Sequence, residues 1–140
     1  MNLYPEDRKR NGIRSVKSKR TYIEVLFSKA LYRMGFRYRL NDKSVFGKPD
    51  IVFRKRKIAV FIDGDFWHGR NWVIRKLDHK SNVEFWIRKI ERNMERDIKV
   101  NEYLKARSWS VIRLWGKDVV KDLDKCIRLV IEEINRKNYE

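Results

Sequence analysis

The stretch KPDIVFRKRKIAVFIDG, residues 48–64, decides the fold of this 140-residue chain. Two apolar segments, near 50–54 and 58–63, flank the basic run Arg54–Lys57. The second segment contains a continuous apolar run, Ile58–Ile62, which is typical of a strand buried on both faces. The pattern predicts a β-hairpin whose turn is the basic run.

Periodic apolar residues predict the elements around this hairpin. Before it, Ile23, Phe27 and Leu31 recur at helical spacing until Gly35, and a short strand follows near 37–40. After it we expect an irregular insert at 64–82, a helix near 83–106, a strand at 111–115 and a closing helix at 123–134. The buried side of the long helix is predicted to carry Phe85, Ile87, Ile90, Met94 and Ile98.

The order of these elements, α-β-β-β-α-β-α, predicts an α/β fold with a mixed central sheet flanked by helices. Residues 1–140 fit a single domain. Residues 1–20 read as a basic N-terminal arm of this domain.

The chain is strongly basic, with 35 Lys and Arg against 19 Asp and Glu and a net charge of +16. Such a surface attracts polyanions, so we expect DNA or RNA as the partner, with charge for solubility or thermal stability as the alternative. The lone Cys126 can form neither an internal disulfide nor a cysteine-rich zinc site. With no signal-peptide pattern and no bilayer-spanning run, we expect a cytoplasmic, nucleoid-associated protein.

Two aspartates meet at the open end of the predicted hairpin. Pairing of Phe53 with Ile58 sets the register. Asp50 then lies opposite Phe61, and Asp63 lies two residues further on the same face. Converging carboxylates repel each other unless a cation lies between them, and Mg²⁺ prefers oxygen ligands. We therefore predict a metal site at Asp50 and Asp63, with ordinary turn roles as the alternative.

Two further residues fit hydrolytic chemistry. Glu24 lies on the apolar side of its helix, where a carboxylate needs a partner, although it also has capping-box spacing from Thr21. His68 can take a proton from an attacking water, because imidazole titrates near neutral pH; a structural or solvated loop histidine is the alternative. Together with Asp50 and Asp63, these residues predict metal-dependent hydrolysis of a phosphodiester.

The stretches FGKPDIVF (46–53) and VFIDGDFWHG (60–69) resemble the very-short-patch-repair (Vsr) DNA mismatch endonucleases. The likeness continues in collinear order over nearly the whole chain. It implies a PD-(D/E)XK nuclease fold and Mg²⁺-dependent cleavage of DNA near a thymine–guanine mismatch. It also implies Asp50 and the Ile62 backbone carbonyl as metal ligands, with Glu24 and His68 in the active site.

The resemblance further implies aromatic wedges that enter the base stack. These are Phe66 and Trp67, helped by the apolar side chain of Ile13. Wedging costs unstacking energy that is smallest at a mismatch, which gives a physical route to selectivity. The full set of expected DNA contacts is Ile13, Arg14, Lys17, Lys48, Phe66, Trp67, Arg70 and Asn93.

The chain also departs from the family pattern. Asp63 replaces a histidine of the family, and Asp65 stands where the general nuclease pattern has a lysine. The structural zinc of the family is not expected here. The positions that match its ligands are Asp65, Arg70, Trp72 and Lys117.

Three functions therefore remain open. The first is a Vsr-type endonuclease that nicks duplex DNA near a thymine–guanine mismatch. The second is a site-specific, homing-type or defence-system nuclease with the same catalytic core, and the third is a non-catalytic basic DNA-binding protein. We expect Mg²⁺, replaceable by Mn²⁺, as cofactor, and a monomer without membrane association. The expected partners are double-stranded DNA and repair proteins.

Overall fold

The computed structural model describes residues 22–64 and 83–138. The chain divides into two compact units, Met1–Arg37 and Tyr38–Glu140, and each is described by itself. Within the described ranges, no helix is long and apolar enough to cross a bilayer.

In the first unit, α3 (Tyr22–Arg33) buries Phe27, Ala30 and Leu31, which recur at the spacing predicted for one helix side. The helix ends where the sequence predicts, because Gly35 adopts φ +95°. The amide of Phe36 then donates back to the carbonyl of Leu31 at 3.2 Å.

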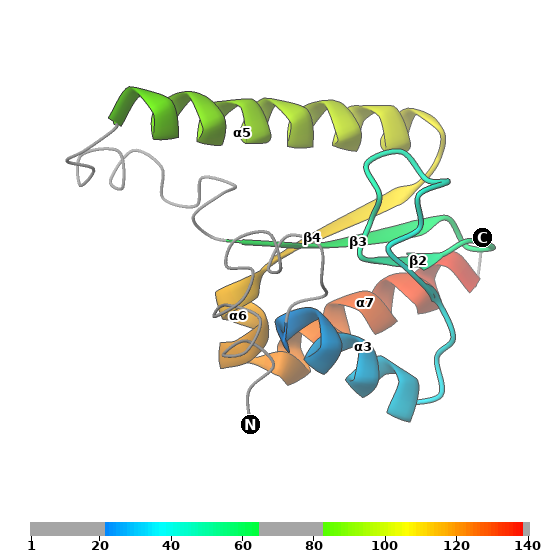
Figure 1. The fold of residues 1–140 in the computed structure, drawn as a ribbon. Coiled ribbons are helices and arrows are strands. Elements are labelled where there is room, and N and C mark those ends of the chain that lie inside the picture. Colours follow the sequence, from blue (N-terminus) through cyan, green and yellow to red (C-terminus); the bar gives the residue numbers. More distant parts are fainter. Residues whose placement is uncertain (1–21, 65–82, 139–140) are drawn as a thin grey trace. The chain divides into compact units, whose positions relative to one another are not determined.

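The second unit contains a four-stranded sheet in the order β1-β2-β3-β4 (Figure 1). The strands are β1 (Arg39–Leu40), β2 (Ile51–Phe53), β3 (Ile58–Asp63) and β4 (Ser110–Trp115). β1, β2 and β3 form an antiparallel meander, whereas β4 runs parallel to β3. Phe53 pairs with Ile58, which confirms the register predicted for the hairpin.

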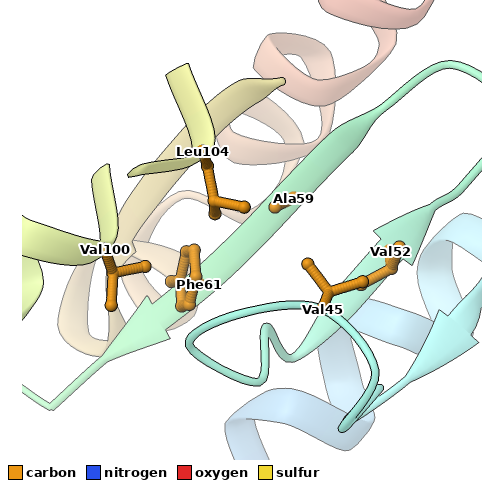
Figure 2. Packing of buried hydrophobic residues seen from close by; sticks show 6 residues of the cluster. All are labelled: Val45, Val52, Ala59, Phe61, Val100 and Leu104. Atoms are coloured by element: carbon orange, nitrogen blue, oxygen red, sulfur yellow. The ribbon is translucent and has the colours of Figure 1, made fainter. Parts of the chain in front are cut away.

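Helices lie on both faces of this sheet, with α5 (Val83–Ala106) on one face and α7 (Leu123–Asn138) on the other (Figure 1). Under α5, sheet residues Ala59 and Phe61 pack with Val100 and Leu104 of the helix (Figure 2). On α7, a stripe of Cys126, Ile127, Val130 and Ile134 is buried. The mixed sheet flanked by helices is the predicted fold class.

Two predictions about the helices were wrong or incomplete. Of the five α5 residues predicted to be buried, only Ile90 is fully buried, while Phe85 and Ile98 are 50% and 56% exposed. The buried side is rotated because polar side chains of α5 turn inward to an ion-pair network on β4, described below. The short helix α6 (Gly116–Lys121), directly after β4, was not predicted.

Candidate active site

The open end of the β2–β3 hairpin brings the two predicted aspartates to one end of the sheet. Asp50 directly precedes β2, and Asp63 is the last residue of β3. Ile51 pairs with Val60, so Asp50 continues the register opposite Phe61. Since side chains alternate along a strand, Asp50 and Asp63 belong to the same face.

The Asp50 carboxylate is held by the backbone of β3. The amide of Ile62 donates to Asp50 Oδ2 at 2.7 Å. Ile51 pairs with Val60 in the antiparallel ladder. Two residues after Val60 on one strand and two before Ile51 on the other, Ile62 therefore lies opposite Pro49.

Pro49 is fully buried and has no N–H, so it cannot return a ladder hydrogen bond to the carbonyl of Ile62. The N–H and C=O of a strand residue point the same way, since hydrogen-bonded pairs exchange both bonds. The Ile62 carbonyl therefore faces the same edge as the Asp50 carboxylate. The Pro-Asp pair thus places a carboxylate beside a carbonyl that has no ladder donor opposite it.

The loop that leads to Asp50, residues 41–48, is fixed against α5. Gly47 has φ +88°, and a Cβ atom there would lie 2.5 Å from Cγ1 of Val100. Only glycine fits this conformation at this distance from the helix. The amide of Asn41 donates to the carbonyl of Asp50 at 3.0 Å, which closes the loop. Lys48, a predicted DNA contact, is exposed and stands two residues before Asp50.

Asp63 is 6% exposed and is engaged by a cation of the protein itself. Nη1 of Arg113, on β4, donates to both carboxylate oxygens at 3.1 and 3.0 Å. The same nitrogen lies 3.4 Å from Oδ1 of Asp97, and Nε donates to Oδ1 of Asn101 at 2.7 Å. We call these four residues the Arg113 network.

The Arg113 network changes the electrostatics expected at the site. Arg113 offsets part of the negative charge of Asp63 and Asp97, so less positive charge is required from a bound ion between Asp50 and Asp63. The role of Asp63 as a metal ligand stays a prediction. Sequence reasoning missed this network, although a lone arginine within the apolar strand 111–115 signalled a buried partner. Asn93, a predicted DNA contact, is half-buried one helical turn before Asp97.

The other predicted site residues are placed as follows. Glu24 lies half-buried in the first turn of α3, in the first unit, and its place in the site stays a prediction. The remaining predicted catalytic and DNA-binding residues lie outside the described part of the chain. They are Ile13, Arg14, Lys17, Phe66, Trp67, His68 and Arg70.

The donors at this edge suit a hard divalent cation. Among the residues that the structure describes, no three His, Cys, Asp or Glu side chains gather into a metal-binding group. The Asp50 carboxylate and the Ile62 carbonyl nevertheless fit Mg²⁺, which protein sites commonly hold through one or two carboxylates while water and phosphate complete the octahedron. Both donors are oxygens.

The basic turn Arg54–Lys57 lies at the opposite end of the hairpin, about 20 Å from Asp63 along β3 at 3.3 Å per residue. Its side chains contact Asp42, Asn138 and the carbonyl of Arg107. These contacts favour a structural, solvated role for the turn over phosphate binding at the site.

Known proteins share this sequence over most of its length. The chain is 55% identical over 123 residues to the Type II nicking enzyme V.HpaIIP of Haemophilus parainfluenzae, covering 88% of this chain and 87% of that protein. It is 49% identical over 135 residues to the Type II nicking enzyme V.NmeDIP of Neisseria meningitidis serogroup C, covering 96% and 90%. Identity to the DNA mismatch endonuclease Vsr of Escherichia coli (strain K12) is 31% over 104 residues, covering 74% and 66%.

The sequence profile of the family described as "DNA mismatch endonuclease Vsr" matches residues 1–74, which include the hairpin and both aspartates. The mixed sheet with helices on its faces agrees with the PD-(D/E)XK nuclease fold implied by the resemblance. The chain belongs to the Vsr family of DNA mismatch endonucleases.

Proposed function

We propose that this DNA endonuclease nicks one strand of duplex DNA at or near a thymine–guanine mismatch. In this proposal the reaction is hydrolysis of a phosphodiester bond and depends on Mg²⁺, which Mn²⁺ can replace. The observation that carries the proposal is the hydrogen bond from the Ile62 amide to the Asp50 carboxylate. It holds the carboxylate beside the Ile62 carbonyl, so two oxygen donors lie at one sheet edge.

The chain's own residues divide the work of hydrolysis. Asp50 and the Ile62 carbonyl would hold the cation, and the hydrogen bond from the Ile62 amide keeps the Asp50 carboxylate from rotating away. Bound Mg²⁺ supplies Lewis-acid chemistry and charge neutralisation at the phosphate. His68 accepts the proton of the attacking water, since imidazole can do so near neutral pH. Glu24 takes part in the hydrolysis in this proposal, as the resemblance to the Vsr family implies.

The relatives favour the finer parts of this proposal. Two of them, at 55% and 49% identity, are named nicking enzymes, which favours cleavage of one strand. A third, at 31% identity, is named a DNA mismatch endonuclease. In this proposal Phe66 and Trp67 insert into the base stack, and the enzyme prefers mismatched DNA because a mismatched pair costs the least free energy to unstack.

The test is a nicking assay on two duplexes of one sequence that differ only in a thymine–guanine pair, with Mg²⁺, with Mn²⁺ and with chelator. The matched control is Asp50→Asn, which keeps an acceptor oxygen for the Ile62 amide but removes the charge that would hold the cation. We expect metal-dependent nicking of the mismatched duplex, and none by Asp50→Asn although it still binds DNA.

Other outcomes separate the alternatives. Equal metal-dependent cutting of both duplexes would replace mismatch recognition with a sequence-directed or defence nuclease. Salt-sensitive binding without cutting under any metal would point to a non-catalytic DNA-binding protein. Full activity of Asp50→Asn would remove the metal assignment.

A further inference from the structure

Cations gather on one flank of α5, away from the site residues already described. Four of them recur three or four residues apart and the fifth follows eight residues later, which places them along one side of the helix. We call this set the cationic flank; its members are Lys89, Arg92, Arg96, Lys99 and, just past the helix end, Arg107.

The glutamates of the helix form a neighbouring stripe, whose members Glu84, Glu91, Glu95 and Glu102 are seven, four and seven residues apart. The remaining acid, Asp97, lies against Arg113. Like charges three or four residues apart destabilise a helix, so folding alone does not favour a row of cations. Arg92, Arg96 and Lys99 are exposed and form no ion pair with the part of the chain that the structure describes.

The cationic flank continues into the loop that carries Asp50. Tyr103 lies on the same stripe, and its ring packs on Phe46 of the loop at 4.5 Å between centroids. The Arg107 guanidinium lies over the Tyr103 ring, 3.5 Å from its centroid, and donates a hydrogen bond to the Tyr103 carbonyl at 3.1 Å. Exposed Lys48 lies in the same loop as Phe46, two residues before Asp50, so the contact between Tyr103 and Phe46 connects the cationic flank with the loop that leads to Asp50.

We propose that the cationic flank and Lys48 bind the phosphate backbone of duplex DNA beyond the cleaved bond, independently of base sequence. The inference deepens the proposed function and rests on it. Charge complementarity selects the partner, because a row of cations suits a regular row of phosphates. From Lys89 to Arg107 the row extends about 27 Å at 1.5 Å per residue, which corresponds to about eight phosphate steps of one DNA strand.

The experiment compares two double variants that remove the same charge. Arg96→Gln/Lys99→Gln alters the cationic flank, and Lys105→Gln/Arg128→Gln alters exposed cations off that flank. Binding to a matched 30-base-pair duplex is measured without divalent metal over a range of salt concentrations. For two lost phosphate contacts, the slope of log affinity against log salt should weaken by about 1.8 in the flank variant. It should stay at the wild-type value in the control.

Two further measurements sharpen the result. Arg96→Lys/Lys99→Arg keeps both charges and should restore the wild-type slope. At protein concentrations well below saturation, the flank variant should nick mismatched DNA more slowly than the off-flank control. Equal slopes for the two Gln variants would overturn the inference. The slope is read on matched DNA without metal, so it stands apart from any failure of mismatch nicking.

Discussion

At the scale of single residues, Pro49 determines what the edge of the sheet can offer. A proline opposite Ile62 leaves the Ile62 carbonyl without a ladder donor, while the Ile62 amide is taken by Asp50. A residue with an N–H would close the ladder there and compete with a cation for that carbonyl. The imino acid and the aspartate after it thus act as a pair.

Pro49→Ala tests this role. The new amide can donate to the Ile62 carbonyl, so we expect a higher Mg²⁺ concentration at half-maximal nicking, with the maximal rate largely kept at saturating Mg²⁺. A Mg²⁺ titration of the initial nicking rate measures this. An unchanged Mg²⁺ requirement would show that the Ile62 carbonyl plays no part in holding the ion.

Arg113 is the other residue on which the site edge depends. Arg113→Met removes the ion pair and both hydrogen bonds that Arg113 makes with buried Asp63, which should cost about 3–5 kcal/mol in the free energy of unfolding. Denaturant unfolding measures the loss. The control, Arg128→Met on the exposed surface of α7, should change stability little. A loss below about 1 kcal/mol would show that Asp63 is balanced by another group.

At the scale of elements, much of the architecture could be predicted because period and turn signals are local. The strand 58–63 and the helix 83–106 have the predicted bounds, and Phe53 pairs with Ile58 as expected. The inward side of α5 could not be predicted from its own sequence. Asp97 and Asn101 face the sheet because they contact Arg113, which lies on β4.

The candidate site was predictable to a similar extent. The position of Asp50 followed from hairpin register, which is a local property. The partner of Asp63 did not, because the parallel pairing that brings Arg113 beside Phe61 joins residues far apart in the chain. The short α6 was missed because it begins at Gly116, a residue with low helix propensity.

The contact between loop 41–48 and α5 can be tested at Gly47. Gly47→Ala introduces both an unfavourable positive φ and a Cβ atom 2.5 Å from Val100. We expect a loss of stability of about 3 kcal/mol from backbone strain and overpacking together. Gly35→Ala is the matched control, because Gly35 also has positive φ but a Cβ there meets nothing within 4 Å. Equal thermal shifts for both variants would show that the loop can move away from the helix.

The hydrogen bonds of Glu133, which connect α7 to β4, should make the stability of the protein depend on pH. Arg136 and Ser110 donate hydrogen bonds to Glu133, and these bonds hold the pKa of Glu133 below its ordinary value of 4.5. The unfolded chain therefore binds the proton more readily. The stabilisation is fully present above pH 4.5 and is lost as pH falls through the lowered pKa of the folded state.

Glu133→Gln should consequently be less stable than the wild type near neutral pH, by about 1 kcal/mol for a partly exposed ion pair. The difference should shrink toward zero in acid. Urea unfolding between about pH 3 and pH 7 measures how the difference in stability changes with pH. A difference that stays constant over this range would mean that the carboxylate charge contributes nothing.

At the scale of the whole molecule, the net charge of +16 affects the fold and the function in opposite directions. Self-repulsion among the cations opposes the compact state, and the same charge attracts DNA. Added salt screens both interactions.

Raising NaCl from about 20 to 200 mM should therefore raise the melting temperature by a few degrees while it lowers DNA affinity by at least about tenfold. Calorimetry and a binding titration in the same buffers measure the two effects. A melting temperature that falls over this range would show that ion pairs stabilise the protein more than the excess charge destabilises it.

The parallel pairing of β3 with β4 also sets the order in which a newly made chain can be completed. Ile58 pairs with Ser110, which is 52 residues later in the chain. The apolar strand β3 therefore leaves the ribosome before β4 has been synthesised. During that interval β3 is an edge strand, the kind of surface that invites association with other nascent chains. Contacts between residues this distant in sequence form slowly, so we expect the pairing of β4 with β3 to be a late step in folding.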